Sequence, residues 1–341
     1  MDKQVILAVA GSGKTRLLIE KLDDEARFLI ITHTNNNYAN LRQRIIQIFG
    51  CIPSNIKLMT YFSFLNSFCF KPLLSDQVGA KGISWDFPPP HTKFKKNQAH
   101  YMSDKGYLYS NRLAKLVEQS SLSDVLKRLE KYIDVMLVDE VQDFGGNDLN
   151  LLCALSDADI NITLVGDFYQ HTFDTSKDGP TNSKIYSDFT KYITKLKKAG
   201  FSPDNTTLLK SHRCSPTVCN FIRDQLSISI ESHRNDETAI HHITDQDTAN
   251  TIFNSNSIVK LFYQNHRKYP CFSENWGKSK GENNYHDVCI VLNKSTFQNY
   301  TDGNLHSLNP QTKSKLYVAC TRARGDLYFV PEDLYSKYKV N

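Results

Sequence analysis

The segment Ala8–Thr15, with the sequence AVAGSGKT, constrains the fold of this chain more than any other stretch. The apolar run Val5–Val9 leads into it and predicts a buried strand, and Arg16–Leu22 after it has the spacing of a helix. A glycine-rich turn between a strand and a helix gathers unpaired backbone N–H groups at the positive end of the helix dipole. The sequence therefore predicts an anion-binding turn inside an α/β fold.

The residue types in this turn suit a nucleoside triphosphate and its metal ion. Glycines let the backbone wrap phosphate, a lysine reaches the outer phosphates, and a threonine hydroxyl can hold Mg²⁺. The usual pattern opens with glycine, whereas this chain has Ala8 there, and a glycine turn that binds nothing is the alternative reading. We expect ATP to contact Ala10, Gly11, Ser12, Gly13, Lys14, Thr15 and Arg16, with Mg²⁺ on Thr15.

Bulk composition places the chain among ordinary globular proteins. Its 341 residues favour two domains, and 40% hydrophobic with 23% charged residues is typical of a folded protein. No apolar run approaches the roughly 18 residues of a membrane span, and no signal peptide is evident, so we expect a cytoplasmic protein without a membrane partner. The eight cysteines lack the paired spacing of a zinc site, and the net charge of +5 is compatible with a polyanionic partner.

Polar and aromatic residues follow two further apolar runs. Arg27–Ile31 predicts a buried strand and leads into Thr32–Asn35, and Ile56–Thr60 predicts another strand with Tyr61–Phe64 at its exit. Side chains at the carboxyl ends of such strands lie where open α/β sheets bind ligands. These residues are candidates for gripping a nucleic-acid strand, with core packing as an equal alternative for the aromatic cluster.

Residues 71–112 differ from their surroundings and predict an insertion rather than sheet, because prolines and glycines interrupt any regular period. Within it, Trp85 and the segment Lys93–Lys96 form either a strand-gripping surface or a solvated basic loop. Helical periodicity returns over Leu113–Leu129.

Two adjacent carboxylates follow the next buried strand. Tyr132–Val138 delivers Asp139 and Glu140, and such a pair at the end of a core strand is costly unless it is ligated or functional. In a protein with a phosphate-binding loop, the first carboxylate can hold Mg²⁺ and the second can activate water. The strand Ile160–Gly166 repeats the pattern and leads to Gln170, placed to sense the γ-phosphate or to orient water, and to Phe173, a candidate for base stacking.

The second half supplies two arginines. An amphipathic lysine-rich helix over Ile185–Lys198 and a hinge over Ala199–Asn205 close the first half. The segment SHRCSP places Arg213 at a strand exit, before a helix expected through Ile230. Residues 231–256 read as loop or sheet edge. A strand is predicted over Val288–Leu292, a helix over Lys315–Arg324 with Arg322 in it, and a last strand over Leu327–Val330.

Together these segments resemble the motifs of the UvrD/Rep-like superfamily 1 helicases, in the order of that family. The matching segments are AGSGKT, THTN, TYFSF, VDEVQD, VGDFYQ, SHRCSP, GKSKGE and YVACTRAR. The resemblance implies an α/β fold with two RecA-like P-loop NTPase domains built on parallel sheets, residues 1–200 and 201–341, with ATP in the cleft between them.

The resemblance also implies a role for each motif residue. It assigns Mg²⁺ to Asp139, water activation to Glu140, coupling to Gln170, and arginine fingers to Arg213 and Arg322. His212 takes the place of an aromatic residue that stacks on adenine, and Gly281 and Glu282 belong to the nucleotide site. Contact with single-stranded DNA is implied for Thr34, Asn35, Thr60, Phe62 and Phe173.

Three departures from the family pattern stand out. Relatives read adenine with a glutamine well upstream of the phosphate loop, and Gln4 is an imperfect substitute for it. About 65 residues separate SHRCSP from GKSKGE, too few for the large inserted domain of full-length family members. The segment after Gly281 is irregular. The motor therefore looks complete, and the parts that regulate unwinding or split the duplex look reduced.

Two functions from different classes follow. The first is an ATP-dependent translocase or helicase on single-stranded DNA, moving 3′ to 5′ by family analogy. The alternative is an ATP-gated DNA-sensing or regulatory subunit of an antiviral defence complex whose partner is a nuclease or another effector protein. Outside the ATP site, no cluster of carboxylates with a lysine or histidine suggests a nuclease in this chain. A backbone grip discriminates RNA from DNA weakly, so either nucleic acid is compatible with the sequence.

Overall fold

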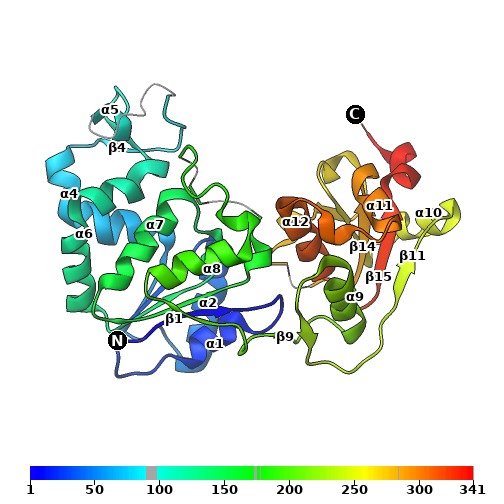
Figure 1. Cartoon of the computed structure of the whole chain (residues 1–341), viewed down its shortest axis with the longest axis horizontal. Coiled ribbons are helices and arrows are strands. Elements are labelled where there is room, and N and C mark those ends of the chain that lie inside the picture. Colours follow the sequence, from blue (N-terminus) through cyan, green and yellow to red (C-terminus); the bar gives the residue numbers. More distant parts are fainter. Residues whose placement is uncertain (90–97, 173–174, 177, 283, 341) are drawn as a thin grey trace. The chain divides into compact units, whose positions relative to one another are not determined.

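The computed structural model describes residues 1–89, 98–172, 175–176, 178–282 and 284–340 (Figure 1). The chain divides into two compact units, and each is described by itself. The first comprises Met1–Ile6, Thr15–Gly166 and Phe173–Asp204, and the second comprises Leu7–Lys14, Asp167–Thr172 and Asn205–Asn341. In the described part of the chain, no helix is long and apolar enough to cross a membrane.

A six-stranded sheet forms the centre of the first unit. Its strand order is β3-β2-β6-β7-β1-β8, and the strands are β1 (Lys3–Leu7), β2 (Phe28–Thr32), β3 (Ile56–Thr60), β6 (Val135–Val138), β7 (Asn161–Gly166) and β8 (Ser202–Asp204). β2 pairs in parallel with both β3 and β6, as β6 does with β7 and β1 with β8. Every residue of β2 is buried, as expected for a parallel strand covered on both faces.

Helices fill the connections between these strands. They are α1 (Lys14–Glu20), α2 (Asn35–Phe49), α3 (Tyr61–Ser63), α4 (Lys71–Val78), α5 (Gln98–Tyr101), α6 (Leu113–Tyr132), α7 (Gly146–Ala154) and α8 (Phe189–Lys198), with a π-helical segment at Phe64–Phe70. Local sequence explains several of their ends. Thr34 caps α2 at its start through the N–H of Asn37, Gly50 ends it in the left-handed conformation, and Asp188 caps α8.

The segment 71–112 differs in part from the expectation of an insertion free of regular structure. It contains the helix α4, and the strands β4 (Gly82–Ser84) and β5 (Tyr107–Tyr109) pair in parallel as a separate two-stranded sheet. Pro72 lies where the π-helical segment Phe64–Phe70 passes directly into α4, so this proline does not end the helical run. The basic segment Lys93–Lys96 lies outside the described residues.

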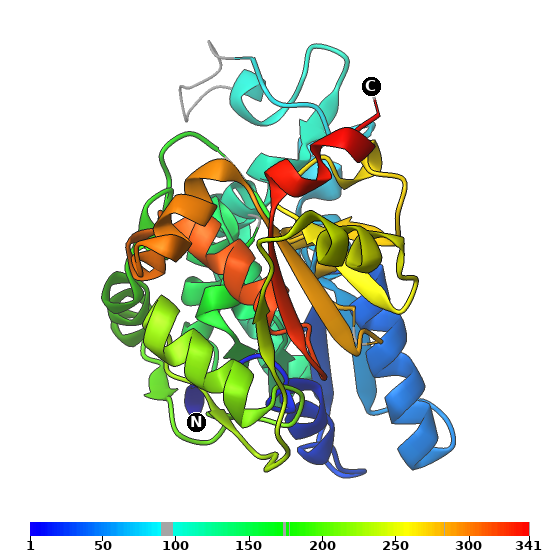
Figure 2. The same cartoon turned by 90° about the vertical axis from the view of Figure 1, so that its right-hand side faces the viewer.

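A five-stranded parallel sheet forms the second unit, and Figure 2 shows it with the surrounding helices. Its order is β11 (Ile240–His242), β15 (Leu327–Pro331), β14 (Asp287–Leu292), β12 (Ile258–Phe262) and β13 (Ser273–Asn275). The strands β9 (Lys210–Ser211) and β10 (Glu231–Ser232) pair separately. Other elements are α9 (Pro216–Leu226), α10 (Gln246–Asn254), α11 (Lys294–Thr301), α12 (Pro310–Cys320) and a 3₁₀ segment at Glu332–Tyr338.

The two faces of this sheet carry different cores. Val288, Ile290 and Leu292 of β14 pack in one core with residues of α9 and α12. The alternating residues Cys289 and Val291 pack in a second core with residues of α10. This two-residue alternation is the normal geometry of a strand buried on both faces. Val9 and Ala10 of the glycine-rich loop belong to the first of these cores, which brings the loop into this unit.

Four expectations for the second half need correction. Residues 231–256 contain β10, β11 and the helix α10, which is capped by Asp245, rather than only loop or edge. The expected hinge contains β8, because Ser202–Asp204 pairs with β1. The helix expected through Ile230 ends at Leu226, where Ser227 is left-handed. α12 starts at Pro310 and ends at Cys320, so Arg322 lies beyond the helix rather than within it.

Candidate nucleotide-binding site

The loop between β1 and α1 has the conformation that a phosphate-binding turn needs. Gly11 and Gly13 have φ angles of 72° and 95°, a region that favours glycine. A Cβ on Gly13 would meet nothing within 4 Å, so the backbone alone requires glycine there. A Cβ on Gly11 would lie 2.7 Å from the Cβ of Arg213, so that glycine also permits a close approach. Ser12 steadies the turn, donating from its Oγ to the carbonyl of Val9 at 2.8 Å.

Three hydrogen bonds connect this loop to other parts of the second unit. The N–H of Val9 donates to the carbonyl of Leu208 at 3.0 Å, and the N–H of His212 donates to the carbonyl of Gly11 at 2.9 Å. The N–H of Ala10 donates to the hydroxyl of Tyr317 at 2.9 Å. The loop is therefore held by the backbone of Leu208 and of His212 in the SHRCSP segment, and by one side chain of α12.

Tyr317 also forms a hydrogen bond with Asp167. Its hydroxyl donates to Oδ2 of Asp167 at 2.9 Å, while Oδ1 of Asp167 accepts the N–H of Tyr169 at 3.1 Å. Tyr317 and Asp167 are both buried, and burial raises the pKa of Tyr317 well above its ordinary value. The hydroxyl therefore keeps its proton and can donate to the carboxylate while it accepts from Ala10. Asp167 caps the 3₁₀ turn Phe168–Gln170, so the chain of contacts reaches Gln170, which is also buried.

The two expected catalytic carboxylates leave β6 with different environments. Asp139 is 3% exposed, its N–H donates to the carbonyl of Ile31 at 2.8 Å, and its Oδ1 accepts the N–H of Glu140 at 2.9 Å. Glu140 has a left-handed backbone, with φ 54°, and accepts a hydrogen bond from the amide of Gln142. A non-glycine residue in that region is uncommon and turns the chain sharply after the strand. The turn separates a buried carboxylate from a more accessible one.

The glycine at the end of β7 leaves room for this arrangement. A Cβ on Gly166 would lie 2.4 Å from Oε1 of Gln142 and 2.7 Å from Cγ1 of Val141. Contacts under 3.0 Å require the neighbour to move, so Gly166 is needed where β7 passes the turn after β6. The side-chain amide of Gln142, which donates to Glu140, is therefore packed closely against the end of β7.

The donor set fits Mg²⁺ bound together with phosphates. The Thr15 hydroxyl and the Asp139 carboxylate supply oxygen, the ligand type that Mg²⁺ takes. Among the residues that the structure describes, no group of three His, Cys, Asp or Glu side chains could hold a metal by itself. Mg²⁺ typically uses one or two carboxylates and completes its shell with water and substrate phosphates, and these residues could provide that share.

The second-unit residues expected at the nucleotide have defined neighbours. The ring of His212 stacks on His233 with centroids 4.0 Å apart. Arg213 donates from an Nη to the carbonyl of Thr321 at 3.2 Å, and burial lowers the pKa of its guanidinium. Arg322 is buried and donates to the carbonyls of Val318 at 3.2 Å and Glu282 at 3.1 Å, so it braces the loop that contains Gly281. These contacts give Arg322 a structural role, and its role as an arginine finger stays a prediction.

The remaining nucleotide candidate, Arg16, is exposed on α1 and pairs with Glu20 at 2.6 Å.

The residues expected to touch nucleic acid lie at the carboxyl edge of the first sheet. Thr34 and Asn35 are exposed at the start of α2, where Oγ1 of Thr34 caps the helix. Thr60 caps α3 in the same way through the N–H of Ser63. Phe62 contacts the exposed Trp85, with ring centroids 4.7 Å apart. Phe173 lies outside the described residues. Capping explains both threonines without a ligand, and their nucleic-acid contacts stay predictions.

Two sets of contacts were not predicted from the sequence, although His33 and Tyr61 lie in segments named there as candidates for gripping a nucleic-acid strand. The first is the pair Tyr317 and Asp167, whose signal was a tyrosine inside an otherwise apolar helical run, since a buried hydroxyl needs a partner. The second is a buried cluster in the first unit. There the hydroxyl of Tyr61 donates to Oδ1 of Asp148 at 2.9 Å, and the ring of His33 lies 4.4 Å from that of Phe144. Nothing in the sequence near Asp148 pointed to it.

The fold and this loop together define a P-loop α/β protein. The family model for the viral superfamily 1 RNA helicase core domain matches residues 108–331, well over half of the chain. The chain belongs to this family. The matched region contains the carboxylate pair and both arginine segments, and the glycine-rich loop lies before it. A search of curated proteins found no match.

Solved structures are similar over nearly the whole chain. One is described as "The structure of PRRSV helicase", with a TM-score of 0.50 and 15% identity, covering 99% of this chain and 54% of that one. Another is "Complex structure of Arterivirus nonstructural protein 10 (helicase) with DNA", with a TM-score of 0.48 and 14% identity, covering 99% of this chain and 63% of that one. This chain thus spans between half and two thirds of the length of these proteins. At 15% identity, the similarity to the first of them concerns the fold alone.

Proposed function

We propose that this chain is the NTP-hydrolysing motor of a nucleic-acid helicase, which uses ATP with Mg²⁺ and moves along a single strand. The observation that carries the proposal is the conformation of the loop Leu7–Lys14, where two left-handed glycines precede a lysine at the start of α1. Successive backbone N–H groups in such a turn form an anion-binding concavity. Membership of a helicase-core family supports the same function.

Each step of the proposed reaction uses a residue of this chain. Lys14 would bind the outer phosphates, and Thr15 with Asp139 would hold Mg²⁺, whose charge would neutralise the phosphoryl oxygens when it is bound. Glu140 orients the attacking water and accepts its proton. Arg213 and Arg322 supply positive charge to the transition state, and Gln170 couples the γ-phosphate to the strand. ATP-dependent alternation between tight and weak grip then gives stepping.

The proposal also specifies which nucleic acid the motor moves along and in which direction. The motif order resembles UvrD/Rep-like enzymes and favours single-stranded DNA with 3′ to 5′ movement, whereas the matched family is one of viral RNA helicases. RNA is therefore the second candidate. Strand-displacement assays with 3′-tailed and 5′-tailed DNA and RNA duplexes separate these cases. Displacement of only the 5′-tailed substrates would overturn the proposed direction.

The test of the motor itself is ATP turnover by the purified chain, with and without single-stranded DNA or RNA. We expect stimulation by one of the two strands, and Glu140→Gln should lose turnover by 10²-fold or more while it retains ATP binding. Glu130→Gln, which changes a carboxylate on α6 outside the site, is the matched control. Equal turnover in Glu140→Gln and the wild-type chain would contradict the role of Glu140.

Tight ATP binding without turnover would instead favour the ATP-gated regulatory subunit. No observation on this chain points to a nuclease or another effector, so the motor is the function that we propose. Co-purification with an effector protein, combined with absence of turnover on either strand, would reverse that preference.

A further inference from the structure

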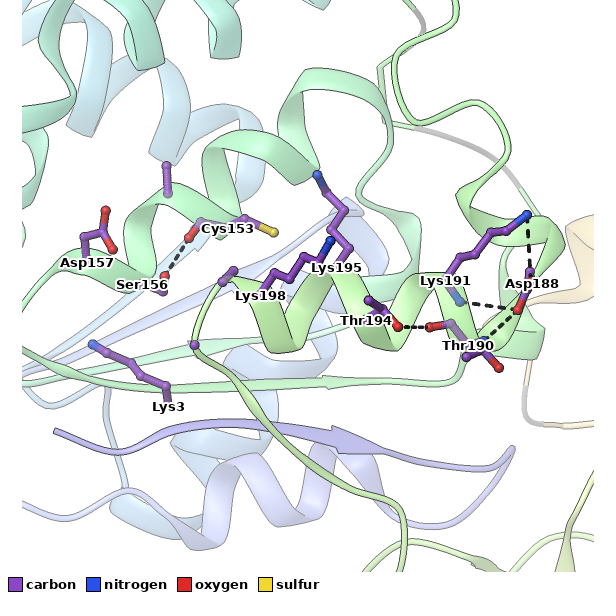
Figure 3. Close-up of a pocket in the computed structure, with 13 residues that line it drawn as sticks. Lys3, Cys153, Ser156, Asp157, Asp188, Thr190, Lys191, Thr194, Lys195 and Lys198 are labelled. Carbon is purple, nitrogen blue, oxygen red and sulfur yellow. Dashed lines mark hydrogen bonds and ion pairs between the residues drawn. The ribbon is translucent and has the colours of Figure 1, made fainter.

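A groove of about 890 Å³ opens on the first unit, away from the residues discussed so far. Figure 3 shows its lining, which comes from the first residues of β1, the end of α7 and one side of α8. Four lysines and two aspartates line it, namely Lys3, Lys191, Lys195, Lys198, Asp157 and Asp188. The groove is therefore positively charged overall.

Three of these lysines lie on one face of α8. Residues 191, 195 and 198 follow the i, i+4, i+7 spacing that places side chains along a single helix face. A different face of the helix carries Tyr192 and Leu196, which are buried. At 1.5 Å per residue the three lysines extend over roughly 10 Å of helix, so they form a row of positive charge and not one point.

Two of the lysines are fixed in place. Nζ of Lys3 donates to the carbonyl of Ala158 at 2.5 Å and to that of Ile160, and burial lowers its pKa. Nζ of Lys195 donates to Oδ1 of Asn150 at 2.8 Å. Side chains that are already ordered lose less conformational entropy when a ligand binds. Lys191 and Lys198 are exposed and can move to meet an anion.

The aspartates of the lining do not cancel this charge. Asp188 accepts the N–H groups of Thr190 and Lys191 through Oδ1 as the cap of α8, and the two aspartates leave an excess of two positive charges among the four lysines of the lining. Its separation from Nζ of Lys191 is 3.9 Å, a weak exposed pair. Asp157 lies at the Lys3 end. The strongest positive region is therefore the α8 side of the groove.

The groove contains none of the candidate nucleotide residues. Lys3 is the first residue of β1, and Gly200 comes just before β8, so this end of the groove lies at the amino ends of parallel strands. From there the lining follows α8 to Asp188 at the start of that helix (Figure 3). The groove is therefore lined by residues different from those of the candidate nucleotide site.

We propose that this groove binds the phosphodiester backbone of a nucleic acid. A row of lysines on one helix face suits successive phosphates, since lysine binds phosphate as a point charge. No aromatic side chain appears among the lining residues that the structure describes, so the groove offers no surface for base stacking. Contact is therefore with the backbone, independent of sequence. This inference rests on the proposed nucleic-acid function and adds a second contact surface to it.

The test compares two pairs of lysine-to-glutamine substitutions. Lys191→Gln with Lys198→Gln removes the exposed charges of the groove. Lys57→Gln with Lys127→Gln removes two exposed charges elsewhere in the first unit, since Lys57 lies on β3 at the far end of the sheet order. Fluorescence anisotropy of labelled single-stranded and duplex oligonucleotides gives the dissociation constant over a range of salt concentrations. Thermal melts confirm that both double variants fold.

We expect the slope of log affinity against log salt to fall for the groove variant by roughly 1.4 on single strands, about 0.7 for each lost phosphate contact. On duplex the expected fall is roughly 1.8. The form of nucleic acid whose slope falls by its own expected amount is the one that occupies the groove. Unchanged slopes, or equal changes in the control pair, would overturn the inference.

The same data keep this inference apart from the proposed function. If the wild-type chain binds oligonucleotides and both variants behave alike, only the groove assignment fails. If the wild-type chain binds no oligonucleotide, the nucleic-acid partner fails and the groove assignment with it. ATP turnover without nucleic acid should be the same in the groove variant and the wild-type chain, because no nucleotide residue is changed.

Discussion

The hydroxyl of Tyr317 lies 2.9 Å from Oδ2 of Asp167 and accepts the backbone N–H of Ala10, also at 2.9 Å. One side chain of α12 therefore joins the glycine-rich loop to the turn that carries Gln170. An N–H of a phosphate-binding loop is a natural donor to phosphate.

Tyr317→Phe tests the structural part of this relationship. The substitution keeps the ring and leaves the N–H of Ala10 and the carboxylate of Asp167 without their shared partner. An unsatisfied buried group costs about 1–3 kcal/mol, so we expect the free energy of unfolding to fall by an amount in that range. Urea denaturation followed by circular dichroism measures it. Tyr107→Phe, at a 40% exposed tyrosine, is the control and should change little. Equal stability of the two variants would show that the Tyr317 hydrogen bonds contribute nothing.

Gly166→Ala should disturb catalysis from outside the nucleotide loop. The added Cβ would lie 2.4 Å from Oε1 of Gln142, whose amide bonds Glu140. Displacement of Gln142 removes a partner of Glu140, and overpacking of this kind typically costs 1–3 kcal/mol. We expect lower kcat for ATP with little change in KM, together with lower stability. Gly82→Ala, whose Cβ would meet only the ring of Tyr107 at 3.3 Å, is the matched control. Normal kcat in Gly166→Ala would argue against the Gln142 contact.

Asp148 predicts a pH dependence of stability. Burial raises the pKa of its carboxyl from 3.8 to about 6, against the hydrogen bond from Tyr61 that lowers it. Between these pKa values the folded chain holds a proton that the unfolded chain has lost, so stability falls as pH rises through this window. Asp148→Asn has no such dependence. Relative to the wild-type chain, it should gain about 2 kcal/mol between pH 4 and pH 6, out of about 3 kcal/mol over the whole titration, since one pKa unit corresponds to 1.36 kcal/mol. Urea denaturation at a series of pH values checks this, and parallel profiles for the two proteins would refute it.

The sequence predicted the buried strands best, because parallel strands covered on both faces are continuous apolar runs. Ile56–Thr60 is β3 to the residue, and β2, β7, β14 and β15 lie within one or two residues of their predicted bounds. Elements with few apolar residues were missed. α10 buries only Ala249, Ile252 and Phe253, and β8 contains a proline. Their structure depends on partners distant in sequence, which local periodicity does not encode.

In the candidate site, too, local features could be predicted from the sequence and long-range contacts could not. The glycine-rich loop is a local structure, and its left-handed glycines follow from its own sequence. The contact from Ala10 to Tyr317 joins residues 307 positions apart, and the approach of Gly11 to Arg213 is also long-range. Motif residues could be recognised one by one, but the hydrogen bonds that give Arg322 and Tyr317 their roles require the folded unit. Tertiary contacts therefore decided what each motif residue touches.

Nucleotide binding itself predicts a thermal shift that depends on Lys14. A ligand that binds only the folded chain stabilises it by about 2.7 kcal/mol at a concentration 100 times its Kd. We therefore expect a non-hydrolysable ATP analogue with Mg²⁺ to raise the Tm of the wild-type chain, and the shift to grow with analogue concentration. Lys14→Met removes the charge that pairs with the outer phosphates and should abolish most of the shift. Lys21→Met, at an exposed lysine just after α1, should retain it. If the shift persists in Lys14→Met, the nucleotide binds somewhere other than this loop. This conclusion holds because the only role assigned to Lys14 is to bind the nucleotide phosphates.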